Sequence, residues 1–206
     1  MSSCVTASML ATVAVLGCNA LTAHAAPFMI VGDDEKVAVA DGKTIILPPG
    51  KDSVLIVDVA NPLDPKIVAN LPLKNSVVGP PVNLAIDPTN SVAIIADSMN
   101  AVQAGDNWKQ VPDDKIYVVD LKAKPPKLVS TIQGDKQPSG LSINPAGNLA
   151  LVANRAAKSI SVLSIQGTDV KLTGNVDMGD GLRRGLYAGR QARAGSQAFG
   201  QQGRAA

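Results

Sequence analysis

The stretch VNLAIDPTNSVAIIADS, residues 82–98, has a near copy in SGLSINPAGNLALVANR, residues 139–155. Each copy contains two short apolar runs separated by an Asx-Pro turn. In such a turn the Asx side chain can accept hydrogen bonds from the backbone ahead, and Pro fixes φ at the second position. Asn90 and Gly147 then tolerate the left-handed conformation that lets the chain return. We therefore expect two β-hairpins of one design.

A second pair of segments repeats as well. KIYVVDLKAKPPKLVSTI, residues 115–132, aligns with SISVLSIQGTDVKLTGNV, residues 159–176, and places Val119 on Leu163. Short strands in a repeat of about 40 to 50 residues are typical of a β-propeller. We predict an all-β fold, a partial β-propeller of about three to four blades, each a four-stranded antiparallel sheet. The alternative is an irregular β-sandwich, which has no reason to repeat a turn design.

The N-terminal segment has features of an export signal. Residues 1–25 contain no Asp, Glu, Lys or Arg, hold an apolar run over residues 9–21, and end in Ala-His-Ala. We predict a signal peptide over residues 1–25 and a periplasmic or secreted mature chain. The apolar run is shorter than the roughly 20 residues of a bilayer span, so no membrane span is predicted. Lipidation at Cys18 after lipoprotein-type cleavage is the alternative.

Cleavage after Ala25 would remove every thiol and imidazole, because Cys4, Cys18 and His24 are the only residues of their kinds. A mature chain of this composition excludes Ser-His-Asp and Cys-His nucleophilic chemistry, His/Cys zinc sites and haem held by His. We predict no metal site and no cofactor. Catalysis would have to depend on Asp, Glu, Lys, Tyr, Ser or a hard cation such as calcium.

The C-terminal residues differ from the rest of the chain. Residues 181–206 contain five Arg and no acid, whereas the whole chain has a net charge of +2. The basic balance therefore comes from this segment, and no nucleic-acid partner is predicted. We predict that residues 26–180 form the partial propeller and that residues 181–206 are an atypical tail, either frameshifted or disordered. The chain would then be a fragment of a longer propeller.

NLALVANRAAKSISVLSI, residues 148–165, resembles the YVTN repeat of bacterial seven-bladed propellers, although residues 151–154 read Leu-Val-Ala-Asn. SVLIVDVANPLDPKIVANLPL, residues 53–73, looks like the second half of the same unit. The resemblance covers about residues 28–180. It implies an exported scaffold that binds an unidentified protein or small molecule in the cell envelope. The alternative that it implies is a lactonase-like hydrolase, in which calcium could be held.

Ligands of propellers bind where the innermost strands and their loops converge. The predicted ligand-binding residues lie on those strands, after the second strands, or on an insertion predicted to be a long loop: Asn83, Asp97, Asn100, Trp108, Ser139, Asn154 and Arg155. For each residue a structural role, as a turn cap or a link between blades, stays open. Asp58 and Asp120 recur at equivalent positions, so we predict that their role is structural.

Overall fold

The computed structural model describes residues 27–76 and 83–179. The predicted signal peptide and the predicted tail lie outside the described residues. Within the described ranges the chain forms thirteen β-strands and no helix, and therefore no helix that could cross a membrane. The predicted all-β class is confirmed: the strands form antiparallel sheets that are arranged as part of a β-propeller.

The first sheet has three strands, in the order β1-β4-β5. A separate hairpin, β2-β3, is inserted between β1 and β4. The bounds of these five strands are Phe28–Asp33 for β1, Val37–Ala40 for β2, Lys43–Ile46 for β3, Ser53–Asp58 for β4 and Lys66–Leu71 for β5.

The second and third sheets have four strands each, in the orders β6-β7-β8-β9 and β10-β11-β12-β13. The second sheet contains β6 (Leu84–Ile86), β7 (Val92–Ala104), β8 (Asn107–Asp120) and β9 (Lys127–Gln133). The third contains β10 (Pro138–Ile143), β11 (Leu149–Asn154), β12 (Ser159–Gln166) and β13 (Asp169–Asp177). Both predicted repeat alignments place equivalent strands on one another. β6 and β7 match β10 and β11, and β8 and β9 match β12 and β13.

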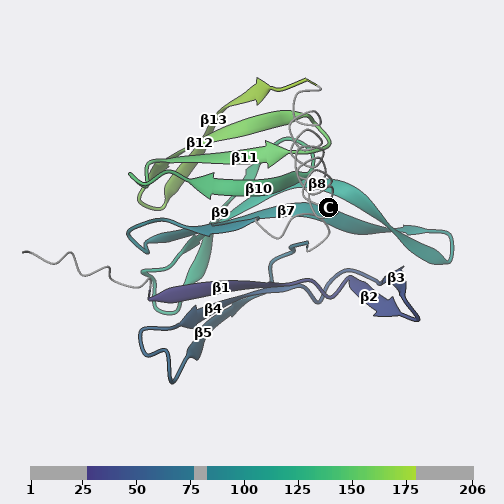
Figure 1. Ribbon diagram of the computed structural model, residues 1–206, viewed down its shortest axis with the longest axis horizontal. Coiled ribbons are helices and arrows are strands. Elements are labelled where there is room, and N and C mark those ends of the chain that lie inside the picture. Colours follow the sequence, from purple (N-terminus) through teal and green to yellow (C-terminus); the bar gives the residue numbers. More distant parts are fainter. Residues whose placement is uncertain (1–26, 77–82, 180–206) are drawn as a thin grey trace, which may run out of the picture.

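The three sheets are stacked face to face in chain order (Figure 1). One apolar cluster, which includes Ile56 and Ile95, lies between the first and second sheets. Another, which includes Ile94 and Val152, lies between the second and third. Successive side chains of a strand point to opposite faces, so the continuous apolar run of β7 supplies both clusters. A stack of three sheets is incompatible with a two-sheet sandwich.

The repeated turn has the predicted geometry. Asn90 and Gly147 have φ values of 54° and 71°. The Asp87 carboxylate accepts hydrogen bonds from the backbone N–H groups of Ser91 and Val92 at 2.6 and 2.7 Å, and Asn144 occupies the same position in the third sheet. A Cβ on Gly147 would lie 3.3 Å from Cδ of Pro88, so the two turns also stack on each other.

The predicted structural aspartates cap turns. Asp58 Oδ1 accepts a hydrogen bond from the backbone N–H of Ala60 at 2.8 Å. Asp120 Oδ1 does the same for Lys122, at 2.8 Å. These bonds order the connection that follows the third strand of a blade.

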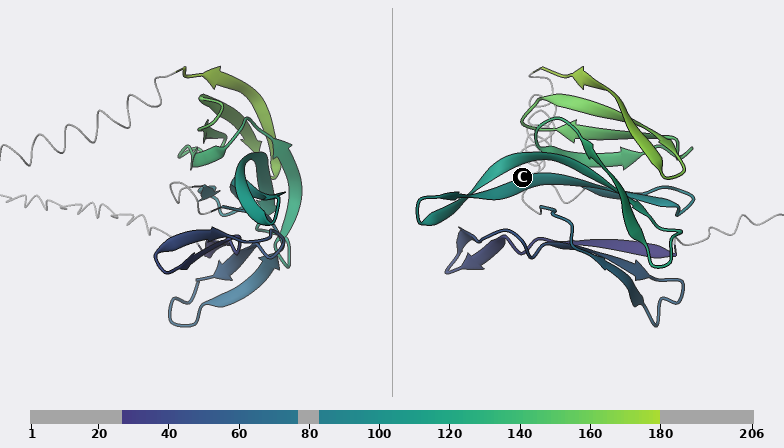
Figure 2. Two further views of the ribbon diagram at one scale, coloured as in Figure 1. Left: turned by 90° about the vertical axis from the view of Figure 1, so that its right-hand side faces the viewer. Right: turned by 180° about the vertical axis from the view of Figure 1, so that it is seen from behind.

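The prediction of a long loop around Trp108 was wrong. Strands β7 and β8 continue through the insertion as one extended hairpin, in which Ala104 pairs with Asn107 and Gln103 with Trp108. The backbone stays in the ladder because pairing satisfies its hydrogen-bonding groups. Figure 2 shows that this hairpin and the β2-β3 hairpin project from the same side of the stack. The two hairpins also contact each other, through β3 and β8.

We predict that Asp87→Ala destabilises the fold by roughly 2–3 kcal/mol, because the buried amides of the turn lose a charged acceptor. Burial alone would raise the pKa of Asp87, but hydrogen bonds from Thr89, Val92 and Ser91 outweigh it and lower that pKa. The stabilisation is therefore present above the ordinary carboxyl pKa and is lost as the pH falls through the lowered value. Urea unfolding at pH 7 and pH 3 measures both effects.

Asp87→Asn is the matched control, because Asn144 fills the same position in the third sheet. It should keep the amide contacts to Ser91 and Val92 and cost less than Asp87→Ala at pH 7. Losses near zero from both variants would show that the side chain does not hold the turn.

Candidate functional site

The same strand position carries a polar side chain in all three sheets. It is occupied by Asp33 at the end of β1, Asp97 within β7 and Asn154 at the end of β11, and the repeat makes β1 the counterpart of the second strands β7 and β11. In the ladders this residue pairs with Ser53 of β4, Lys115 of β8 and Ser159 of β12, respectively. The three positions are equivalent in the repeat and form the candidate site.

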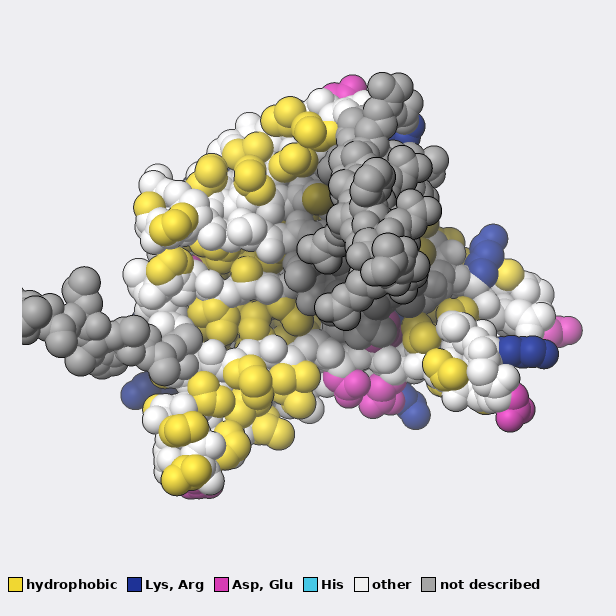
Figure 3. Space-filling view, viewed as in Figure 1, with side chains coloured by type: hydrophobic (Ala, Val, Ile, Leu, Met, Phe, Trp, Pro, Cys, Tyr) yellow, Lys and Arg dark blue, Asp and Glu magenta, His cyan; other side chains and the backbone are white. Residues whose placement is uncertain are grey.

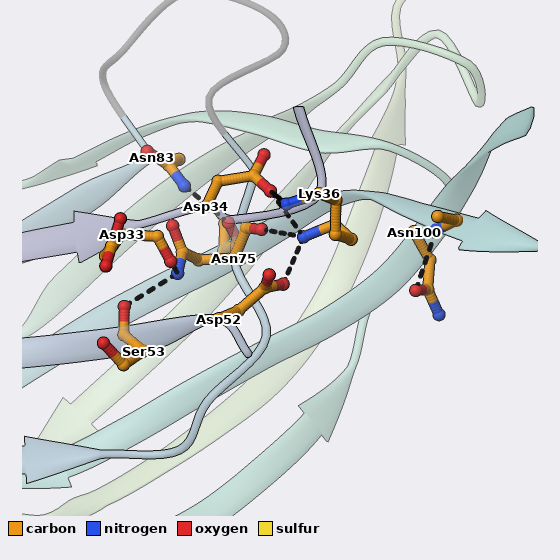
Figure 4. Close-up of polar contacts among 10 residues, drawn as sticks. Asp33, Asp34, Lys36, Asp52, Ser53, Asn75, Asn83 and Asn100 are labelled. Carbon is orange, nitrogen blue, oxygen red and sulfur yellow. Dashed lines mark hydrogen bonds and ion pairs between the residues drawn. The ribbon is translucent and has the colours of Figure 1, made fainter. Parts of the chain in front are cut away.

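In the first sheet a lysine is buried at this end of the strands. Lys36 is fully buried, and its ammonium group binds the carboxylates of Asp52 and Asp34, the latter at 2.9 Å (Figure 4). It also donates to the backbone carbonyl of Asn75 at 2.5 Å. Burial by itself would lower the pKa of Lys36, but the two carboxylates outweigh burial and raise that pKa. Lys36 therefore stays charged in the interior.

Asn75 holds the ends of two strands together. Its side-chain amide donates to the backbone carbonyls of Asp33 and Ser53 at 2.8 and 2.9 Å. The contact requires Gly32, because a Cβ at that position would lie 2.7 Å from Oδ1 of Asn75. The bonds satisfy backbone carbonyls where β1 ends and β4 begins.

In the second sheet Asp97 is buried without a hydrogen-bonding partner. Its side chain is fully buried, and neither carboxylate oxygen has a partner among the described residues. It lies on the same strand face as Ile95, which packs against the first sheet. The opposite residue, Lys115, bonds instead to Asp113 at 2.9 Å.

This isolation changes the acidity of Asp97. Burial, assisted by the negative charge of Asp113, raises its pKa from 3.8 to about 7. The charge of Lys36 acts in the opposite direction without cancelling the effect. Asp97 is thus a carboxyl group that gains and loses a proton near neutral pH, which is the property expected of an acid–base group.

In the third sheet the same position is occupied by Asn154, whose side-chain nitrogen is hydrogen-bonded. The amide of Asn154 donates to the hydroxyl groups of Ser159 and Ser161 at 3.1 and 2.8 Å. Ser161 in turn donates to Oδ1 of Asn175 at 2.7 Å. Oδ1 of Asn154 has no partner among the described residues, but its nitrogen is bonded, whereas neither oxygen of Asp97 is. Asp97 is therefore the unusual residue of the three.

The structure brings three of the predicted residues together. Asn83 donates to the backbone carbonyl of Ala96 at 2.9 Å, and Ser139 is hydrogen-bonded to Ser98 at 3.0 Å. Since Ala96 and Ser98 flank Asp97 in the chain, Asn83 and Ser139 bond to the residues on both sides of it, at the backbone of Ala96 and the hydroxyl of Ser98. The Ser98–Ser139 bond also links the second and third sheets.

The other predicted residues lie apart from Asp97 or are exposed. Asn100 and Trp108 belong to the extended β7-β8 hairpin, and Figure 4 shows Asn100 away from Lys36 and Asp52. The Arg155 side chain is exposed just after β11. Ligand binding by the seven predicted residues stays a prediction.

Lys36, Asp52 and Asn75 were not among the residues predicted from the sequence. One signal was present: MIVGDD, residues 29–34, aligns with AIIADS, residues 93–98, and would have placed Asp33 and Asp34 at the site. Lys36 carried no such signal, because its partners Asp52 and Asn75 lie 16 and 39 positions away in the sequence.

Two further observations concern the surroundings of the site: an open hollow beside it, and the lack of a metal-binding cluster among the described residues. An open hollow of about 540 Å³ lies beside the first sheet, and its lining includes Asp33, Glu35, Lys51 and Asp52. Among residues 27–76 and 83–179, no group of three or more His, Cys, Asp or Glu side chains could hold a metal ion.

No protein-family model matches this chain, and no curated protein matches it significantly. Solved structures do resemble it. A candidate 6-phosphogluconolactonase from Bacteroides fragilis has a TM-score of 0.45 and 13% identity, over 72% of this chain and 38% of that one. The periplasmic gluconolactonase of Pseudomonas aeruginosa has a TM-score of 0.43 and 14% identity, over 68% and 44%. This chain spans less than half of either protein, and similarity at this level does not identify a shared activity.

We predict that Asp97→Asn stabilises the protein, and increasingly so as the pH rises. Folded Asp97 keeps its proton to about pH 7, whereas the unfolded carboxyl ionises near 3.8. The folded state therefore binds more protons in this interval, and wild-type stability falls as the pH rises through it. Asn removes this penalty, with a gain of up to roughly 4 kcal/mol above pH 7. Urea unfolding from pH 4 to pH 8 measures the difference.

Asp113→Asn serves as the control. Burial would raise the pKa of Asp113, but bonds from Lys115 and the backbone of Asp114 lower it. Its neutral variant should therefore lose stability at pH 7. If Asp97→Asn were also destabilising at pH 8, the buried carboxyl would have a stabilising partner.

Proposed function

We propose that this chain is a sector of an exported propeller hydrolase of the lactonase-like kind, in which Asp97 moves the proton. The single observation that supports the proposal is the buried Asp97 carboxyl, which has no hydrogen-bonding partner among the described residues and a pKa raised to about 7. The predicted signal peptide over residues 1–25 supports a periplasmic or secreted location.

The chemistry requires one group that both accepts and returns a proton. Water attacks the lactone carbonyl, a base takes the water proton, and the ring C–O bond breaks as the leaving alkoxide is protonated. A carboxyl that is about half ionised at neutral pH can perform both transfers. Lys36 lies close enough to act on Asp97 electrostatically and would favour the negative charge that develops on the carbonyl oxygen.

A substrate can reach Asp97 only if the protein opens around it. The Asp97 side chain is fully buried between the first and second sheets, so these sheets must open locally at this end to admit a substrate. The residues that follow Asp97 in β7 include Ser98 and Asn100, so opening on this side breaks fewer apolar contacts than opening across residues 92–96.

A binding scaffold without chemistry is the second candidate function. The observation that favours it is the open hollow beside the first sheet, where Lys51 lies near Asp33 and Glu35. Charges of both signs around one hollow suit a small polar or zwitterionic ligand. The partner or ligand in this case would bind away from Asp97.

The test is hydrolysis of a panel of simple and sugar δ-lactones by protein purified after expression of the full reading frame. We predict measurable turnover, with a rate that rises with pH about a midpoint near 7 as Asp97 becomes the free base. Asp97→Asn should lower kcat/KM by about 10²- to 10⁴-fold. Asp106→Asn, at the exposed tip of the β7-β8 hairpin, should leave the rate unchanged.

Two results would reject the hydrolase. One is the absence of turnover above the uncatalysed rate, and the other is an Asp97→Asn variant as active as the wild type. Ligand binding without turnover that is lost in Lys51→Ala, and kept in Asp97→Asn, would establish the second candidate instead.

A further inference from the structure

Both end sheets of the stack carry apolar side chains on the face that lacks a neighbouring sheet. On the third sheet Leu149 and Leu151 are 37% and 43% exposed, and on the first sheet Met29 and Val31 are 47% and 37% exposed. Figure 3 shows hydrophobic side chains over both the lowest and the uppermost sheets. These two faces are the candidate interaction surfaces.

The outward face of the third sheet repeats a face that is buried elsewhere in the same chain. We name it the leading face and define it by Leu149, Leu151, Ile160 and Val162. Its equivalents in the second sheet are Val92, Ile94, Ile116 and Val118, which are buried against the third sheet. Its equivalents in the first sheet include Phe28 and Ile30, which pack against the second.

The outward face of the first sheet corresponds to the other face of the second and third sheets, the one that packs against the preceding sheet. We name it the trailing face and define it by Met29, Val31 and Leu55. Its equivalents in the second sheet are Ala93, Ile95 and Tyr117, which pack against the first sheet. In the third sheet the equivalent positions include Ala150 and Val152, which are buried against the second.

Each contact between sheets within the chain therefore joins one face of the leading kind to one of the trailing kind. The first–second and second–third contacts both follow this rule. Among residues 27–76 and 83–179, one leading face and one trailing face remain unpaired, at opposite ends of the stack. The surface that each one fits is the surface that the other end of the same chain presents.

We propose that two copies of this chain associate head to tail, with the leading face of each copy packed on the trailing face of the other. Such contacts join different surfaces, and they form a closed assembly only when the rotation returns to its start. Two copies bring six stacked sheets, which lies within the roughly four to eight blades of closed propellers. The second copy supplies the neighbour that buries each exposed apolar face.

The polar residues around these faces fit the same arrangement. The centre of the leading face is apolar, whereas the outermost strand β13 carries the exposed ion pair of Lys171 and Asp169, 2.6 Å apart. The trailing face is bordered by the hollow with Glu35 and Lys51. An apolar centre with a polar rim is the usual anatomy of a protein interface.

The test is the mass of the protein in solution, measured by sedimentation velocity after expression of the full reading frame. We expect a dimer for the wild type and monomers for Leu151→Asp and for Val31→Asp, because each variant has lost one of its two faces. A mixture of the two variants should recover dimers, since one supplies an intact trailing face and the other an intact leading face. Leu63→Asp, at a residue that is 94% exposed and lies on neither face, should stay dimeric.

Four results would overturn the proposal. A monomeric wild type would show that the faces do not join copies of this chain. A ladder of larger species would show that the contact does not close. A dimer of either single variant would show contact between like faces, and a mixture without dimers would remove the head-to-tail arrangement. Circular dichroism of each variant confirms that its sheets are intact, as expected for substitutions at partly exposed positions.

Discussion

Burial of both faces of the central sheet is the constraint on which this structure depends. β7 is apolar over residues 92–96 and β8 over residues 116–119, and alternate side chains of these runs enter different clusters. A strand of this composition is stable only between two other sheets. The stack therefore cannot be reduced to a single blade, because each sheet depends on its neighbours for most of the apolar area that it buries.

The equivalent polar positions are arranged against this apolar background in three different ways. The first sheet surrounds a buried ammonium group with carboxylates at Lys36, and the third bonds the amide nitrogen of Asn154 to hydroxyl groups. The second leaves the carboxyl of Asp97 without a partner among the described residues. An unpaired buried carboxyl is destabilising, and repetition of the fold does not require it, because an amide occupies the same position one sheet later. Asp33 at the equivalent position is exposed, so burial without a partner is what sets Asp97 apart and makes it a functional candidate.

The sequence predicted those parts of the structure that depend on local chemistry. The Asx-Pro turns around Pro88 and Pro145, the strands that flank them and their order within a blade follow from residue type and spacing. The length of the β7-β8 hairpin did not, because Gly, Asn and Asp around Trp108 suggest a loop and only the cross-strand ladder keeps them in a strand. The ion cluster at Lys36 could not be predicted from local sequence either, because its partners are distant in the chain and meet only in the folded structure.

The two projecting hairpins have a consequence for how such a repeat can vary. One, β2-β3, is a separate hairpin and the other is an extension of β7 and β8, yet both leave the blade between its second and third strands. In the third sheet the same connection is a short turn between β11 and β12. The number of residues in this connection can therefore change without altering how the sheets pack, because the added residues project beyond the buried clusters. The connection is a natural grafting point, where a foreign peptide or a small domain could be inserted into each blade and displayed on one side of the stack.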